Sequence, residues 1–205
     1  MESFIFIKPN SICHDLCDEI ISKFEDEPKK HEGLTSGGVQ PDVKNTIDFN
    51  IPPNCEKWYK INKCLLKVLT QNIDEYIDSL SNCENYKTTS PLFKYDFKPI
   101  DKKNVIFYSF MVQRYLKNEG RYVYHNDFNI NVEKNEYRIM TYLFYLNDVE
   151  EGGETVFWND YKIKPEKGKL ILFPACWSFP HCGRMPISSN KYIITGWIYQ
   201  KIGSC

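Results

Sequence analysis

His125, Asp127, His181 and Lys191 are the residues whose types and spacing point most clearly to chemistry. His125 and Asp127 are separated by one residue, so on a β-strand both side chains would point to the same face. An imidazole and a carboxylate on one face can bind one metal ion, and His181 can supply a second imidazole from farther along the chain. These residues predict a metal site with coordination positions left open for other ligands.

This ligand set is typical of non-haem Fe(II) oxygenases, although the same donors would also bind Zn(II), Mn(II) or Co(II). Each residue taken alone could be structural, with His125 at the surface, Asp127 in a turn and His181 in the packing. The chain has only 4 histidines, so finding two of them in this pattern favours a site. A zinc hydrolase would need a general base near the metal, and the sequence offers no candidate.

Lys191 begins the run KYIITGWIY, in which Lys191, Ile193, Thr195 and Trp197 would share one strand face. A lysine on such an inward, apolar face is costly unless an anion neutralises it. A ligand carboxylate would do so through a charge-assisted hydrogen bond. Lys191 is therefore the predicted anion anchor. A lysine that reaches solvent at the strand edge is the alternative, and Arg184, in a predicted turn, is the second candidate anchor.

Composition limits the classes of protein that fit. The chain has 205 residues, with 26 basic against 27 acidic residues and a net charge of −1. This length can bury a core, and the balanced charge argues against a nucleic-acid partner. No polybasic or long apolar segment predicts membrane association. The 8 cysteines form no C-x-x-C pair and are expected to be reduced thiols.

Two helices are predicted in the first half of the chain. Residues 11–27 carry an apolar residue at every fourth position, and Ser11 is the candidate N-cap. Residues 54–80 carry a longer apolar stripe without an internal glycine or proline.

The rest of the first half is predicted to be mostly irregular. Residues 1–10 lack the basic start of a secretory signal and are expected to form a first strand, so a cytoplasmic location is expected. Residues 28–53, rich in Gly, Pro and polar residues, predict a long loop with one short strand at 46–49. This loop is a candidate lid, with a passive surface connection as the alternative. Residues 81–104 are also predicted to be irregular.

Short β-rich runs separated by turn signals fill the second half. They are Val105–Tyr115, Tyr122–Phe128, Tyr137–Leu146, Thr155–Phe157, Lys169–Phe173 and Lys191–Tyr199. Many short strands at this spacing indicate a β-sandwich or jelly roll. Helices first and strands afterwards indicate an α+β fold with the helices packed on one sheet. We expect a single domain over residues 1–205, with helical support and lid loops in 1–104 and a catalytic jelly roll in 105–200.

From about Tyr108 to Tyr199, the chain resembles the prolyl 4-hydroxylase-type branch of the Fe(II)/2-oxoglutarate-dependent dioxygenases. The matching segments are HND (125–127) preceded by Tyr115 and Tyr122, RIMTYLFYLNDVEEGGETVF (138–157), PEKGKLILF (165–173), HCG (181–183) and KYIITGW (191–197). H-x-D alone is a weak signal. The ordered set, with its EEGGET turn and its spacing from histidine to lysine, is specific.

The resemblance implies a double-stranded β-helix in which His125, Asp127 and His181 bind Fe(II). It implies that Lys191 binds the distal carboxylate of 2-oxoglutarate. The family uses O2 as the second co-substrate and often ascorbate to rescue oxidised iron, so both are expected here.

Four further positions acquire roles through the resemblance. Tyr115 and Thr155 would hydrogen-bond the co-substrate, and Trp197 would wall the pocket. Arg138 falls where the family places a residue on the substrate side. Packing in the β-core is the alternative for Tyr115, Thr155 and Trp197.

The implied reaction is hydroxylation of an unactivated C–H bond, with peptidyl proline as the first candidate substrate. A free amino acid or another small molecule is the alternative substrate, and a jelly-roll binding module without turnover is the alternative class. Nucleic-acid demethylation is disfavoured, because the chain lacks a basic stripe and its anchor is lysine rather than the arginine of that branch.

Overall fold

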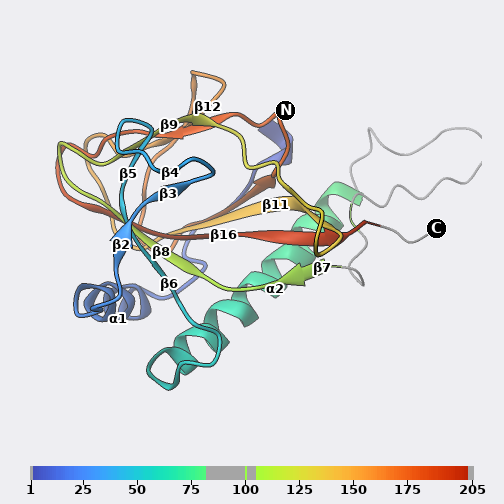
Figure 1. The fold of residues 1–205 in the computed structure, drawn as a ribbon, viewed down its shortest axis with the longest axis horizontal. Helices are drawn as coiled ribbons and strands as arrows, with labels where there is room; N and C mark the ends of the chain where they lie inside the picture. The colour runs from blue at the N-terminus through green and yellow to red at the C-terminus, as the bar shows by residue number, and fades with distance from the viewer. Residues whose placement is uncertain (1, 82–99, 101–104, 203–205) are drawn as a thin grey trace, which may run out of the picture.

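The computed structural model describes residues 2–81, 100 and 105–202. The stretch 82–104, predicted to be irregular, lies outside the described residues except for Ile100 and thus stays a prediction. Figure 1 shows the arrangement of the described elements: both helices lie below a large sheet, and strands of a smaller sheet lie above it.

Both predicted helices are present as α1 (His14–Glu25) and α2 (Tyr59–Ser81). Short 3-10 turns lie at Glu2–Phe4 and, directly before α2, at Glu56–Trp58. The predicted N-cap is wrong. The α1 cap is Cys13, which makes no side-chain capping bond. The Ser11 hydroxyl instead accepts a hydrogen bond from Asn72 of α2, so this serine links the segment before α1 to α2.

The large sheet is antiparallel throughout and has the strand order β1-β14-β11-β16-β8-β6-β2, with β10 paired to β11 and β7 paired to β16. Its strands are β1 (Phe6–Lys8), β2 (His31–Glu32), β6 (Ile47–Asn50), β7 (Val105–Phe107), β8 (Met111–Tyr115), β10 (Ile130–Asn131), β11 (Glu136–Tyr145), β14 (Leu170–Pro174) and β16 (Lys191–Lys201).

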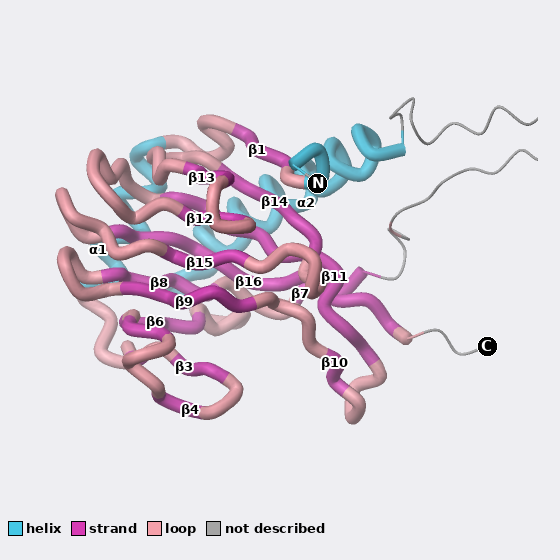
Figure 2. The backbone as a smooth tube through the Cα atoms, turned by 90° about the horizontal axis from the view of Figure 1, so that it is seen from above, coloured by secondary structure: helices cyan, strands magenta, loops and turns pink. Residues whose placement is uncertain are grey.

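The smaller sheet has the order β13-β12-β15-β9-β5 and is also antiparallel. Its strands are β5 (Lys44–Asn45), β9 (Arg121–His125), β12 (Thr155–Phe157), β13 (Tyr161–Ile163) and β15 (His181–Gly183). A hairpin of β3 (Leu34–Thr35) and β4 (Gly38–Val39) projects from one side of the molecule, as Figure 2 shows.

Alternating residues of β11 separate two cores, as expected for a strand covered on both faces. Tyr142 and Phe144 pack into the core between the large sheet and the helices. Leu143 and Tyr145 pack into a second core between the two sheets. The predicted α+β layout, with helices on one sheet, is confirmed, and the opposite face of that sheet is left to form the site.

The segment 28–53 differs most from its prediction. It was expected to be a loop with one strand, and that strand exists as β6. It also contributes β2, β3, β4 and β5, so that β6 pairs with β8 of the large sheet and β5 pairs with β9 of the smaller one. The four strands that the prediction missed are only two residues long, too short for a periodic pattern to reveal them.

Two further expectations concern the cysteines and membrane association. The cysteines within the described residues are all free thiols, as predicted for this sequence. None of the helices in the same residues is long and apolar enough to cross a membrane.

Candidate metal centre and co-substrate pocket

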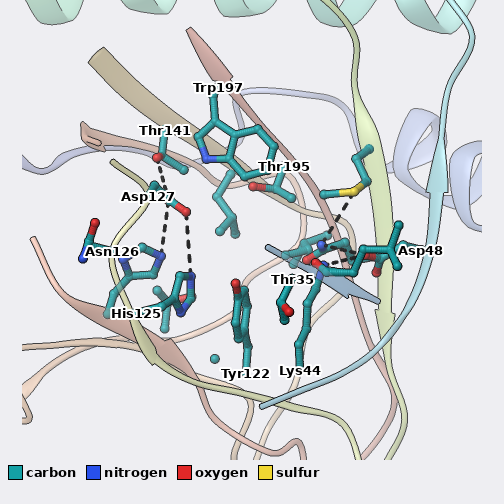
Figure 3. A pocket seen from close by; sticks show the side chains of 18 of the residues that line it. Thr35, Lys44, Asp48, Tyr122, His125, Asn126, Asp127, Thr141, Thr195 and Trp197 are labelled. Atoms are coloured by element: carbon teal, nitrogen blue, oxygen red, sulfur yellow. Dashed lines mark hydrogen bonds and ion pairs between the residues drawn. The ribbon is translucent and has the colours of Figure 1, made fainter. Parts of the chain in front are cut away.

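A cavity of about 470 Å³ opens between the two sheets. Eight of the candidate site residues line it, and Figure 3 shows several of them converging. They are Tyr115, His125, Asp127, Arg138, Thr155, His181, Lys191 and Trp197. The fold therefore brings together residues that are spread over much of the chain.

The two histidines meet because their strands are neighbours. His125 of β9 lies directly opposite His181 of β15, and their ring centroids are 4.3 Å apart. Asp127 reaches the same point by a different route from the one predicted. β9 ends at His125, so Asp127 is not on the strand. The hydroxyl of Thr141 on β11 donates a hydrogen bond of 2.7 Å to its carboxylate and holds it in place.

The three side chains present their ligand atoms to one another. Asp127 Oδ1 lies 3.8 Å from His125 Nε2, and Oδ2 lies 3.5 Å from His181 Nε2. On the far side of each ring, Nδ1 contacts a backbone carbonyl, at 2.8 Å from Val123 and 3.1 Å from Phe179. A carbonyl accepts only, so each Nδ1 carries hydrogen and a neutral ring has its lone pair on Nε2.

Burial, followed by repulsion from His181, lowers the pKa of His125 to about 4, so this ring is neutral at pH 7. Burial alone would raise the pKa of Asp127, but the neighbouring imidazoles and the Thr141 hydrogen bond outweigh it and lower that pKa. Acceptor atoms thus face one another within 4.8 Å. A cation between them would remove the repulsion among these acceptor atoms. Two imidazole nitrogens and a carboxylate oxygen suit a divalent transition metal such as Fe(II).

Lys191 lies at the buried end of the same cavity. Its side chain is 1 % exposed, and its Nζ donates a hydrogen bond of 2.9 Å to the carbonyl of Gly153. The Nζ also sits 4.1 Å from the ring centroid of Tyr115. Burial lowers the pKa of Lys191 to about 7. An ammonium has three donors, so Lys191 can still bind a carboxylate. Arg184, the second candidate anchor, is exposed and does not line the cavity.

Thr155 and Tyr115 line the cavity together with Lys191. Thr155 Oγ1 accepts a 2.7 Å hydrogen bond from Tyr145, which leaves its own hydrogen for another acceptor. The Tyr115 hydroxyl donates to Gln113 Oε1 at 3.3 Å.

Trp197 and Arg138 form the opposite wall. The guanidinium of Arg138 stacks 3.5 Å from the Trp197 ring centroid and contacts the backbone oxygen of Asp127 at 3.4 Å. The Trp197 Nε1 is buried and has no acceptor among the described residues, so it is a donor available to a ligand. A β-bulge between Arg138 and Met140 explains why Arg138 and Thr141, three residues apart, both face the cavity.

The comparisons with known proteins agree with this geometry. The family model of the 2OG-Fe(II) oxygenase superfamily matches residues 110–199, which contain the three clustered ligands and Lys191. Residues 110–199 belong to the 2OG-Fe(II) oxygenase superfamily. Fe(II) and 2-oxoglutarate are the cofactor and co-substrate that this family and the His-Asp-His cluster imply.

The curated relatives are plant proteins. The chain is 34% identical over 112 residues to probable prolyl 4-hydroxylase 10 of Arabidopsis thaliana, covering 40% of this chain and 37% of that protein. It is 32% identical over 112 residues to probable prolyl 4-hydroxylase 8 of the same plant, covering 38% of each. The match thus spans less than two fifths of the length of these relatives.

Solved structures share the fold over nearly the whole chain. The viral collagen prolyl hydroxylase of Paramecium bursaria Chlorella virus-1, in its 2OG complex, aligns with a TM-score of 0.65 and 22% identity over 96% of both chains. A prolyl hydroxylase from Trichoplax adhaerens, in complex with a hypoxia inducible factor peptide fragment, aligns with a TM-score of 0.66 and 20% identity over 97% of this chain and 84% of the other. These likenesses confirm the predicted double-stranded β-helix.

Several residues that line the cavity were not singled out as site residues from the sequence. Tyr122 stacks on His125 with ring centroids 3.6 Å apart, because a second register shift turns both toward the cavity. Thr141 orients Asp127, and its position in the matching segment could have identified it. Lys44 and Asp48 line the far side of the cavity, and their buried ion pair had no signal in the sequence.

Proposed function

We propose that this chain is an Fe(II)/2-oxoglutarate-dependent dioxygenase that hydroxylates an unactivated C–H bond, with peptidyl proline as its substrate. The observation that carries the proposal is the meeting of His125, Asp127 and His181 in one cavity with a buried lysine. The family match and the prolyl hydroxylase relatives support the reaction and the substrate class.

In this proposal, His125 Nε2, His181 Nε2 and Asp127 hold Fe(II), and Lys191 pairs with the distal carboxylate of 2-oxoglutarate. When bound, the metal and co-substrate would supply an oxidation in which 2-oxoglutarate, O2 and R–H give succinate, CO2 and R–OH. The protein contributes orientation. Thr141 fixes Asp127, the two backbone carbonyls fix the rings, and the walls around the cavity exclude water.

Arg138 and Trp197 are the proposed contacts on the substrate side. The Arg138 guanidinium lies between the Trp197 ring and the backbone of Asp127, so it is held beside the metal ligands without a carboxylate partner among the described residues. Its remaining donors suit the carbonyl oxygens of a peptide. Ascorbate is proposed as the reductant that restores oxidised iron.

Succinate release tests the proposal. Anaerobically Fe(II)-loaded protein is given 2-oxoglutarate and O2, with and without a panel of proline-containing peptides, and the products are analysed by mass spectrometry. We expect a peptide to stimulate succinate release and to gain one oxygen atom on proline. Slow succinate release without any peptide effect would retain the oxygenase and reject the peptide substrate. Absence of succinate despite metal binding would reject the enzyme and favour a binding module.

A further inference from the structure

The turn that joins β12 to β13, residues 158–160, has a strained backbone. Trp158 and Asn159 both have positive φ angles, of 49° and 72°. Asparagine tolerates this left-handed conformation, whereas a bulky tryptophan adopts it only at a cost. Such outliers persist where the surrounding structure fixes them, and they cluster at functional sites. The contacts of Trp158 show what fixes this one.

Trp158 is fixed by the segment that precedes His181. Its indole Nε1–H donates a hydrogen bond of 2.9 Å to the carbonyl of Ser178, and its backbone N–H donates to the carbonyl of Pro180 at 3.4 Å. Its ring packs against that of Phe179, with centroids 5.4 Å apart. One residue thus contacts all three residues that come directly before the proposed metal ligand.

The same turn is anchored to the strand that carries His125. The backbone N–H of Asn159 donates a hydrogen bond of 2.9 Å to the hydroxyl of Tyr124, the residue before His125 on β9. β12 itself pairs with β15, so that Phe157 lies opposite His181. The turn is therefore tied to both strands that supply the imidazoles, which holds the indole in place.

The segment that the indole contacts sets the orientation of the His181 ring. The carbonyl of Phe179 lies 3.1 Å from Nδ1 of His181 and accepts its hydrogen, so that Nε2 faces Asp127. Residues 175–180, between β14 and β15, form neither helix nor strand. No sheet ladder fixes the Phe179 carbonyl, and the contacts made by Trp158 take the place of one.

We propose that Trp158 is a positioning residue for the metal centre. Its indole N–H fixes the backbone of residues 178–180, so that the Phe179 carbonyl holds the His181 imidazole with Nε2 toward the metal. This role rests on the metal site of the proposed function, and Trp158 itself does not line the cavity. The left-handed turn contributes because it directs the indole at Ser178.

Titration of the metal-free protein with Co(II), which suits the same donors, tests this role. The d–d absorption bands of bound Co(II) depend on where its ligand atoms lie, so they report the position of the His181 ring. Trp158→Phe keeps an aromatic ring and removes the N–H donor. It should weaken Co(II) binding about three- to tenfold, below the roughly tenfold to 100-fold typical of a direct partner of a ligand. It should also shift the bands at saturation.

Trp177→Phe is the matched control. Trp177 lies in the same segment but is 78 % exposed. The same change there should leave both the dissociation constant and the absorption bands unchanged. Urea denaturation of the metal-free variants measures stability separately, because a purely structural tryptophan would lower stability without shifting the bands of bound Co(II).

Trp158→Gly covers the case in which Trp158→Phe does not fold. Glycine adopts a φ of 49° without strain, which offsets part of the lost packing, so this variant should fold. It removes the donor and the ring together and should weaken Co(II) binding about tenfold or more. A folded Trp158→Gly that binds Co(II) like wild type would overturn the positioning role.

The outcomes separate this role from the function on which it rests. Wild-type protein that binds no Co(II) would overturn both. Wild-type protein that binds it, with an unchanged dissociation constant and unchanged bands in Trp158→Phe, would overturn the role of Trp158 alone. Equal weakening by Trp158→Phe and Trp177→Phe would do the same, because it would show a general effect of loosening this segment.

Discussion

The cavity has two walls that contain the same kinds of charged residues but leave them in different states. On the far wall, Lys44 and Asp48 neutralise each other at 2.6 Å. On the metal side, Lys191 contacts the neutral carbonyl of Gly153, and within the described residues no carboxylate pairs with it. There, too, the Asp127 carboxylate lies 3.8 Å from His125 Nε2 and 3.5 Å from His181 Nε2. The metal side can therefore bind charged ligands, because its charged groups have no partner of opposite charge. The Lys44–Asp48 pair cannot, because its two charges already neutralise each other.

Removing a metal ligand should have the largest effect of the variants considered, on the metal side of the cavity. Asp127→Ala should lower the affinity for Fe(II) by more than about 100-fold, since even residues behind the ligands typically contribute tenfold to 100-fold. Substrate-driven succinate release should disappear with it. Metal titration and a succinate assay measure the two effects. Glu133→Ala, at an exposed acidic position, is the control and should behave as wild type. Full hydroxylation by Asp127→Ala would contradict the assignment of the metal site.

Breaking the satisfied pair should affect the stability of the fold. Lys44→Met leaves the buried Asp48 without its counter-charge and should lower the free energy of unfolding by about 3–5 kcal/mol. Urea denaturation measures this loss. The double variant Lys44→Met/Asp48→Leu should recover most of it, because no unpaired charge then remains buried. A single variant as stable as wild type would show that the pair is not structural.

Lys191→Met, unlike Lys44→Met, should weaken binding of the co-substrate and leave the stability of the fold unchanged. It removes the proposed partner of the 2-oxoglutarate carboxylate and should weaken co-substrate binding roughly 10- to 100-fold, the contribution of a charge-assisted hydrogen bond. Stability should not fall, because a buried lysine with a neutral partner is replaced by an apolar side chain. Calorimetry and urea denaturation measure both, with the exposed Arg184→Met as control. Equal affinity in Lys191→Met and wild type would move the anchor elsewhere.

A smaller effect is expected from pH. The pKa of Lys191 lies at about 7 in the folded, unliganded protein, below its ordinary value of 10.5. Above pH 7, binding of 2-oxoglutarate must therefore take up a proton, and its affinity should fall by up to about tenfold per pH unit. Calorimetry in buffers of different ionisation enthalpy counts that proton.

The same pKa difference sets a trend in stability. Between pH 7 and pH 10.5, Lys191 is protonated in the unfolded chain and largely neutral in the folded chain. Lys191 therefore makes the free energy of unfolding rise with pH in this range. Below pH 7, both states are protonated and this contribution is constant. Lys191→Met should abolish both the proton uptake and the trend. A proton uptake unchanged in that variant would assign it to another group.

The two walls also differ in how far the sequence predicted them. The ligand set and Lys191 were predicted because their types and spacing have chemical meaning without the fold. Asp127 lies with the two histidines as expected, but not because it shares a strand face with His125. β9 ends at His125, and the Thr141 hydroxyl orients the Asp127 carboxylate.

The far wall could not be predicted in this way. Lys44 and Asp48 lie on short strands whose partners, β9 and β8, come much later in the chain. Their pairing depends on tertiary contacts that no local period records. The register shift that turns Arg138 and Thr141 to one face has the same origin, because a bulge overrides the alternation on which sequence patterns depend.

A crystal structure of the protein with Mn(II) and 2-oxoglutarate tests the central claim most directly. We expect anomalous density for one metal among His125, His181 and Asp127, with the distal carboxylate of the co-substrate on Lys191 and the Lys44–Asp48 pair intact. A metal bound elsewhere, or a carboxylate on Lys44 in place of Asp48, would contradict it.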